Sequence, residues 1–369
     1  MVSHNRRPCR ESQPTRQVHR QPAVLKSWLV ERGHGVSGNL RMERLGSGWS
    51  TITSVAADED GRSWLVREPR PGTAHDVRRE ANVMMALAGS GVPVPRVIGN
   101  GTARGGLSFL VMERIDGQSL QSEDAADRLT PEARRGLGRQ MVKTMARLHA
   151  LDPARLGIPL RAGPFLDHHM DALIDVWTRC GSGSTHDSSW RAVLARLVER
   201  RPVRPPLRPS ILHGDFRLSN ILVRDGQIIA LLDWELSTAG DAIADLAWLL
   251  DDWRSSDEPA IWLPTPTRAG GFPTRKELID EYRDLTGFSV AHLGYYRGFM
   301  NWRAATLLQG VAHRRRLGFE DDLRDGVWLD GTVAELLMTA AAELNRSDIV
   351  DLQAVSTLPK IRPRRVMSW

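Results

Sequence analysis

The fold of this 369-residue chain is decided by residues 211–250, which read ILHGDFRLSNILVRDGQIIALLDWELSTAGDAIADLAWLL. Three acceptor side chains occur in this stretch: Asp215, then Asn220 five residues later, then Asp233 a further thirteen residues on. The segment between Asn220 and Asp233 predicts a β-hairpin, because Asp225-Gly226 suits a turn with positive φ angles. A hairpin folds the chain back on itself, so we expect Asp233 to lie beside Asn220.

The chemistry of these three side chains favours a functional site. Amide and carboxylate oxygens are the ligands that Mg²⁺ prefers when it is bound to phosphates, so Asn220 and Asp233 are a candidate metal pair. Asp215, at the start of the loop, is then free to face a substrate hydroxyl. Asp, Asn and Gly are individually common turn formers. The ordered set, with a hairpin between its parts, is what favours function.

The spacing of Asp215 and Asn220 resembles the catalytic loop of protein kinases. The fuller pattern is His-Gly-Asp-x-x-x-x-Asn, then Asp-Trp-Glu, then Gly-Asp-x-x-x-Asp-Leu-Ala. It is similar to the aminoglycoside phosphotransferase family, and within it to the branch of hydroxyacyl-CoA kinases related to the kinase domain of acyl-CoA dehydrogenase fusion proteins. The resemblance runs from Leu40 to Gly318.

This resemblance implies a kinase that uses ATP and Mg²⁺ to phosphorylate a hydroxyl group of a small molecule. It implies that Asp215 is the catalytic residue, which accepts or orients the proton of the attacking hydroxyl. The implied metal ligands are Asn220, Asp233 and Glu235. The residues implied to support the catalytic loop from behind are His213 and Asp245.

Patterns along the whole chain predict an α+β, bilobal, protein-kinase-like fold with a small β-rich N-lobe and a larger, mainly helical C-lobe. Residues 41–69 alternate in hydrophobicity and predict three strands, with turns at Gly46-Ser47-Gly48 and Glu59-Asp60-Gly61. Residues 108–115 predict one further strand. Helices are expected over 23–32, 76–88, 131–151, 165–180 and 188–200. The predicted domains are a disordered basic tail over 1–25, the N-lobe over 26–115, the C-lobe over 116–346 and a basic tail over 347–369.

The N-lobe is expected to bind the nucleotide. Backbone amides around Gly46, Ser47, Gly48 and Ser50 suit phosphate binding, although a plain hairpin turn explains them equally well. Arg67 stands where protein kinases have Lys, and is expected to bridge the phosphates and pair with Glu80. A solvated pair of Arg67 with Glu68 is the alternative. The expected hinge, whose backbone reads the adenine edge, contains Met112, Glu113 and Ile115.

Charge favours an anionic acceptor. Residues 155–210 contain nine Arg but only five acidic residues, and the whole chain carries a formal charge of +6. Aminoglycosides are polycations, so a pocket that binds them is expected to be rich in carboxylates. A hydroxyacyl-CoA or another anionic metabolite is therefore the favoured substrate. An antibiotic-inactivating phosphotransferase is the alternative. Further members of the cationic trend are Arg297, Arg303, Arg314, Arg315 and Arg316. The tryptophans expected either to line an apolar pocket or to form core are Trp177, Trp190, Trp253, Trp262 and Trp302.

Several other function classes are disfavoured. The chain has no apolar segment of about 18 residues that would span a membrane and no secretory signal, so a cytoplasmic location is expected. The basic tails lack a recognised nucleic-acid-binding motif. A non-catalytic nucleotide-binding pseudokinase would be expected to lack an acceptor residue, and all three are present. The oligomeric state is not encoded in any pattern we recognise.

Overall fold

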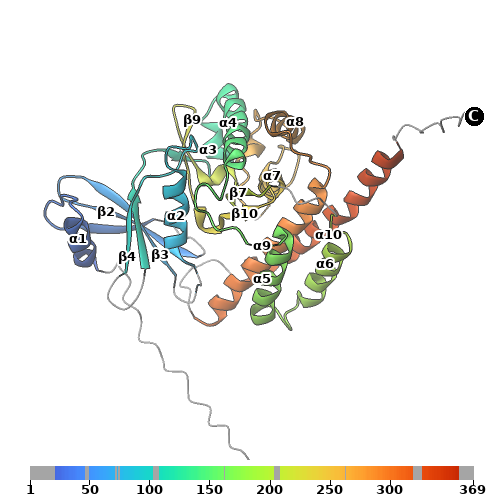
Figure 1. The fold of residues 1–369 in the computed structure, drawn as a ribbon, viewed down its shortest axis with the longest axis horizontal. Coiled ribbons are helices and arrows are strands. Elements are labelled where there is room, and N and C mark those ends of the chain that lie inside the picture. The colour runs from blue at the N-terminus through green and yellow to red at the C-terminus, as the bar shows by residue number, and fades with distance from the viewer. Residues whose placement is uncertain are drawn as a thin grey trace, which may run out of the picture. The chain divides into compact units, whose positions relative to one another are not determined.

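The computed structural model describes residues 21–45, 50–70, 73, 75–102, 108–161, 163–202, 208–261, 263–318 and 326–356. The chain divides into two compact units, which we describe separately (Figure 1). The first unit contains residues 1–117 together with 230–235, and the second contains 118–229 together with 236–369. Asp233 and Glu235 therefore belong to the first unit, although the predicted boundaries assign them to the C-lobe.

The first unit is built on a five-stranded antiparallel sheet with the strand order β1-β2-β3-β5-β4. Its strands are β1 (Arg41–Leu45), β2 (Thr51–Ala57), β3 (Ser63–Pro69), β4 (Val97–Thr102) and β5 (Ser108–Glu113). The first three strands and the turn at Glu59-Asp60-Gly61 are as predicted, and Gly61 in this turn has a positive φ of 83°. The register pairs Thr53 with Arg67, which fixes the position of Arg67 in the middle of the sheet.

Strand β4 is absent from the sequence prediction, and it contains Gly99 and Gly101, a residue type that is depleted in strands. The structure gives these glycines a packing role instead. A Cβ on Gly101 would lie 2.5 Å from the Phe109 ring and 2.6 Å from the Trp28 ring, so only a glycine lets the two aromatic side chains approach the strand. Glycine inside a strand often marks such a close approach.

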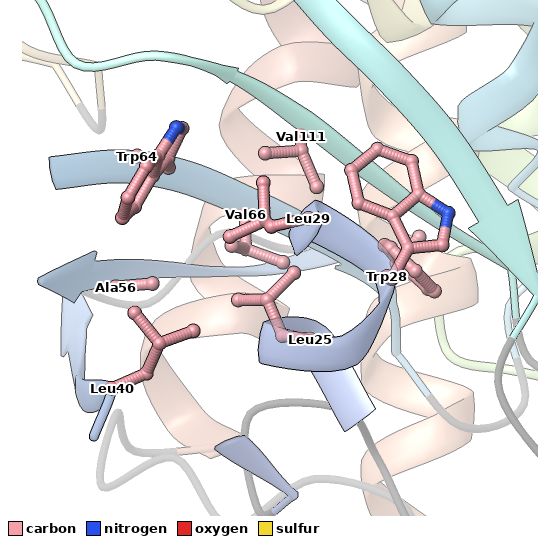
Figure 2. Close-up of a cluster of buried hydrophobic side chains, with 9 residues drawn as sticks. Leu25, Trp28, Leu29, Leu40, Ala56, Trp64, Val66 and Val111 are labelled. Atoms are coloured by element: carbon pink, nitrogen blue, oxygen red, sulfur yellow. The ribbon is translucent and has the colours of Figure 1, made fainter. Parts of the chain in front are cut away.

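Two helices complete the described part of the first unit. Helix α1 (Pro22–Glu31) begins three residues before the predicted end of the tail at 25, and it packs Leu25, Trp28 and Leu29 onto the sheet (Figure 2). Helix α2 (Val77–Leu87) is capped by the Asp76 carboxylate, which accepts a hydrogen bond from the Arg78 backbone N–H.

The predicted buried face of α2 is partly wrong. Val77, Ala81 and Met84 are buried as expected, but Met85 is 47% exposed and Glu80 is buried in its place. Glu80 lies inside because it forms an ion pair with Arg67, and sequence periodicity by itself treats a glutamate as a surface residue.

The second unit is mainly helical. Its helices are α3 (Glu123–Asp127), α4 (Pro131–Ala150), α5 (Phe165–Cys180), α6 (Asp187–Glu199), α7 (Ile243–Asp252), α8 (Arg275–Thr286), α9 (Leu293–Arg316) and α10 (Gly326–Ser356). Helices α9 and α10 pack along each other, and α5 and α6 contact them (Figure 1). Helix α10 continues to Ser356, past the predicted start of the C-terminal tail at 347. None of the described helices is long and apolar enough to cross a membrane.

Tryptophans form part of the core of the second unit. The Trp177 and Trp190 rings stack with centroids 4.8 Å apart, and Trp190 packs on Trp302 at 4.9 Å. All three are almost completely buried, and so is Trp253. These four are core residues, so the pocket-lining interpretation is wrong for them. Trp262 lies outside the described residues.

Candidate active site

The predicted hairpin is present between Asn220 and Asp233. It consists of β8 (Ile221–Arg224) and β9 (Gln227–Leu231), with Asp225 and Gly226 at φ 50° and 70°. Positive φ angles at both central residues match the twist of the flanking strands, which is why Asp-Gly suits this turn. Asn220 belongs to the second unit and Asp233 to the first, so their predicted joint hold on a metal ion remains a prediction.

The loop that carries Asp215 follows strand β7 (Ser210–Leu212), which pairs with β10 (Thr238–Gly240). Gly214 in this loop has a φ of 83°, and a Cβ there would lie 2.4 Å from the Leu236 carbonyl oxygen. The middle residue of His-Gly-Asp must therefore be glycine for both conformational and steric reasons.

Asp245 holds the backbone of this loop from helix α7. Its carboxylate accepts hydrogen bonds from the backbone N–H groups of His213 at 2.7 Å and Gly214 at 2.8 Å. His149 Nε2 lies 3.3 Å from the same carboxylate, and its Nδ1 lies 2.8 Å from the Tyr282 hydroxyl. Burial acts to raise the pKa of Asp245, but the hydrogen bonds and the nearby histidines outweigh it and lower the pKa.

Both carboxylate oxygens of Asp215 are fixed by donors. Oδ1 accepts a hydrogen bond from Trp248 Nε1 at 2.6 Å, and Oδ2 accepts one from Asn220 Nδ2 at 2.7 Å. The backbone N–H of Asp215 donates to His213 Nδ1 at 3.1 Å. Among the described residues, no donor contacts the Asn220 side-chain oxygen, so that oxygen is available to a cation. The structure thus brings together four of the predicted residues: Asp215, Asn220, His213 and Asp245.

Two further residues contact this loop in ways that the sequence analysis did not predict. Trp248 lies one helical turn after Asp245, and the spacing of three residues puts both on the same face of α7. That spacing was a usable signal. Arg303 on α9 donates from Nη1 to the Gly214 carbonyl oxygen at 2.9 Å, and no sequence pattern indicates this contact. Arg303 and Arg297, which ion-pairs with Asp251, therefore serve internal contacts and not the cationic surface predicted for them.

The first unit gathers carboxylates around Arg67. Arg67 Nη2 lies 2.7 Å from Asp233 Oδ1 and 3.4 Å from Glu235 Oε2, and Nη1 lies 3.2 Å from Glu80 Oε1. Glu235 also accepts a hydrogen bond from the Ser50 hydroxyl. Burial and the Asp233 carboxylate together raise the pKa of Glu235 to about 7, although Arg67 and Ser50 act against them. The predicted pairing of Arg67 with Glu80 is confirmed.

The remaining predicted nucleotide-binding residues lie at the end of β5, just after it, or outside the described residues. Met112 and Glu113 are the last residues of β5, and Ile115 follows in the segment without regular structure before β6 (Gln118–Ser119). Their role as a hinge stays a prediction. Gly46, Ser47 and Gly48 lie outside the described residues.

A cavity of about 440 Å³ lies in the second unit beside β10 and the start of α5. Its basic lining residues are Arg161, His168, His169 and Arg201, of which Arg201 forms an ion pair with Asp167. Its acidic lining residue is Asp241, which accepts a hydrogen bond from the Tyr296 hydroxyl. Leu160, Phe165 and Leu166 add an apolar surface. Thr238 in the wall of the cavity pairs with Leu212, which lies three residues before Asp215.

Comparison with known proteins identifies the family. The profile of the phosphotransferase enzyme family matches residues 41–280, which is most of the chain and includes every predicted site residue. The chain belongs to this family. Mouse acyl-CoA dehydrogenase family member 10 is 28% identical over 82% of the chain, and human acyl-CoA dehydrogenase family member 11 is 29% identical over 70%. The chain covers only 30% and 34% of these two relatives, about one third of their length.

Solved structures of aminoglycoside phosphotransferases share the fold of this family member. One from Ralstonia eutropha, classed with the aminoglycoside phosphotransferases, has a TM-score of 0.70 at 22% identity and covers 88% of this chain and 98% of its own. APH(4)-Ia in complex with AMP-PNP and hygromycin B has a TM-score of 0.59 at 19% identity, covering 86% of this chain and 99% of its own. The predicted protein-kinase-like fold is confirmed.

Proposed function

We propose that this member of the phosphotransferase enzyme family transfers the γ-phosphoryl group of ATP to a hydroxyl group of a small, anionic molecule. The observation that carries the proposal is the fixed carboxylate of Asp215. Trp248 and Asn220 hold its two oxygens at 2.6 and 2.7 Å, on a loop whose backbone Asp245 anchors. Phosphoryl transfer depends mainly on positioning and charge neutralisation, and this loop supplies the positioning.

In this reaction, Asp215 orients the acceptor hydroxyl and takes its proton. The hydroxyl oxygen forms a bond to the γ-phosphorus as the bond to the β,γ-bridging oxygen breaks, and ADP leaves with that oxygen. An anionic base with both oxygens already directed by hydrogen bonds loses little freedom when it binds the acceptor. His213 and Asp245 keep the loop backbone in place throughout.

The oxygen atoms of Asn220, Asp233 and Glu235 suit Mg²⁺, which prefers hard amide and carboxylate ligands. The free Asn220 side-chain oxygen fits this role, because its amide nitrogen is the atom that binds Asp215. Bound Mg²⁺ would neutralise charge on the β- and γ-phosphates. The nucleotide itself is assigned to Ser50, Arg67, Glu80, Met112, Glu113 and Ile115, together with Gly46, Ser47 and Gly48. The complex of APH(4)-Ia with AMP-PNP supports a nucleotide site in this fold.

The cavity beside β10 supports an anionic acceptor. Arg161 is exposed and makes no hydrogen bond or ion pair with any described residue, so its charge is available to a ligand. An apolar wall next to cationic side chains suits a molecule with an acyl chain and a phosphate or carboxylate group. A hydroxyacyl-CoA has both features, and the acyl-CoA dehydrogenase relatives agree with that choice. The aminoglycoside 3'-phosphotransferase of Enterococcus faecalis is 29% identical over half of the chain. This similarity supports an antibiotic as the alternative acceptor.

Replacement of Asp215 tests the reaction. Asp215→Ala and Asp215→Asn should lower kcat by about 10²–10⁴-fold, because each removes the proton acceptor. Binding of Mg²⁺·AMP-PNP, measured by calorimetry, should be unchanged. The control is Asp257→Asn, an exposed loop residue. Full turnover by purified Asp215→Ala would overturn the assignment, and a wild-type protein that binds nucleotide without any turnover would indicate a pseudokinase.

A screen of acceptors tests the substrate class. ADP release with Mg-ATP should occur with hydroxyacyl-CoA compounds and be absent with a panel of aminoglycosides. Arg161→Ala should raise KM for the accepted compound about 5–10-fold, the loss expected for one charge-assisted contact, with KM for ATP unchanged. Arg155→Ala, at an 87% exposed side chain outside the cavity, is the matched control. Turnover of aminoglycosides alone would refute the anionic acceptor.

A further inference from the structure

Arg67 already forms an ion pair with Asp233, the carboxylate to which a metal ion would bind. Its guanidinium Nη2 lies 2.7 Å from Asp233 Oδ1, and it also donates to Thr51 Oγ1 at 2.9 Å. At the other end, Nη1 pairs with Glu80, whose side chain is only 1% exposed. Thr51 and Glu80 thus hold the guanidinium against the Asp233 carboxylate.

The burial of these groups makes the arrangement hard to rearrange. The Arg67 side chain is 10% exposed, whereas Asp233 is 35% exposed and can be reached from solvent. Withdrawing Arg67 would deprive the buried Glu80 carboxylate of its arginine partner and leave, among the described basic side chains, only His75 Nε2 beside it, at 3.4 Å, which is strongly unfavourable. A guanidinium is not deprotonated in proteins, so Arg67 keeps its positive charge in this position.

A divalent cation that approaches Asp233 alone therefore meets a fixed positive charge. Asp233 would have to share its oxygens between the guanidinium and the metal ion, and the two cations repel each other at short range. A nucleoside triphosphate changes this balance, because its phosphates carry enough negative charge to pair with both cations. The same guanidinium that opposes a free ion then becomes a favourable partner of the phosphates.

We propose that Arg67 determines the selectivity of the Asp233 site, so that it takes a divalent cation only together with a nucleoside triphosphate and excludes the free ion. This inference rests on the proposed function, since it assumes that Asp233 is a metal ligand. It gives Arg67 a second role, the exclusion of the free ion, in addition to its proposed contact with the phosphates.

Binding of Mn²⁺, followed by the loss of the electron paramagnetic resonance signal of the free ion, tests the proposal without any turnover. Wild-type protein should bind Mn²⁺ at least tenfold more weakly alone than in the presence of AMP-PNP. Arg67→Gln removes the charge and keeps a hydrogen-bond donor, and it should bind free Mn²⁺ at least tenfold more tightly than wild type. Arg67→Lys keeps the charge and should exclude the free ion as wild type does. Arg44→Gln, at an exposed position on β1, is the control.

The outcomes separate this inference from the proposed function. Wild-type protein that binds free Mn²⁺ as tightly as it binds Mn²⁺ with AMP-PNP would overturn the inference, and this comparison needs no variant to fold. Equal binding of free Mn²⁺ by wild type and a folded Arg67→Gln protein would overturn it as well. Wild-type protein that fails to bind Mn²⁺ even with AMP-PNP would instead refute the proposed metal and nucleotide site.

Discussion

Trp248 and Asp252 lie one helical turn apart on α7, on the side of the helix that faces the Asp215 loop. Trp248 directs one Asp215 oxygen through its indole N–H. Asp252 is a different case, because it is 2% exposed and, within the part of the chain that the structure describes, no other residue hydrogen-bonds to its carboxylate. A buried acid without a partner is costly when ionised, so it is expected to keep its proton.

The pKa of Asp252 predicts a pH-dependent stability. Burial raises this pKa to about 8, and the carboxylates of Asp215 and Asp251 add to the effect while Arg217 opposes it. In the unfolded chain the same group loses its proton near its ordinary value of 3.8. Between these two values the folded state binds the extra proton, so stability falls as the pH rises, and the loss is complete above the folded-state pKa.

Asp252→Asn removes this titration. The free energy of unfolding of the variant, relative to that of wild type, should therefore increase as the pH rises from about 5 to about 8. Urea denaturation at each pH measures this difference. Asp257→Asn, at an exposed position, should show no such trend. A constant difference between Asp252→Asn and wild type across that range would mean that Asp252 is ionised in the folded protein.

At the scale of elements, two turns with positive φ serve different purposes. Gly226 closes the β8–β9 hairpin with a φ of 70°, and nothing lies within 4 Å of where its Cβ would be. Gly214 has a φ of 83°, and its Cβ would collide with the Leu236 backbone. The hairpin turn therefore needs only the conformational freedom of glycine, whereas the Asp215 loop also needs the small size of glycine.

Alanine substitutions separate the two requirements. Gly226→Ala should lower the free energy of unfolding by about 1 kcal/mol, the cost of a left-handed residue with a side chain, and leave kcat unchanged. Gly214→Ala should cost about 2–4 kcal/mol and reduce kcat, because the loop must shift to relieve the collision. Urea denaturation and steady-state kinetics measure both effects. Equal losses in the two variants would show that steric contact at Gly214 is unimportant.

At the scale of the whole molecule, a ligand that binds only the folded protein raises its stability, and Asp233 is the proposed metal ligand in the first unit. Mg²⁺ and AMP-PNP together should then stabilise the protein against unfolding by about 2.7 kcal/mol at a ligand concentration of 100 times Kd. Asp233→Asn should abolish the metal-dependent part of this gain, as measured by thermal denaturation with and without Mg²⁺. Asp225→Asn, in the hairpin turn, should retain it. A full metal-dependent gain in Asp233→Asn would remove Asp233 from the ligand set.

Much of the fold and the centre of the site were predictable because their signals are local. The Asp225-Gly226 turn, the positions of α5 and α6, and the spacing of Asp215 and Asn220 each depend on residues close together in sequence, where backbone preferences and hydrogen bonding act directly. The family resemblance added roles that residue patterns do not contain. Strand β4 was missed because glycine prefers turns, and this preference dominates a prediction made from neighbouring residues. Its glycine at 101 is required instead because a Cβ there would collide with the Phe109 and Trp28 rings.

The sequence by itself determined which chemical groups are present and where the chain turns, because those properties belong to short segments. Only the tertiary structure decided what surrounds each group. It buried Glu80 and Asp252, directed Trp248 onto Asp215, and gave Arg67 three carboxylate partners from two separate segments. Burial, pairing and pKa depend on the packing of residues that are far apart in the chain, and periodicity within one segment carries no record of that packing.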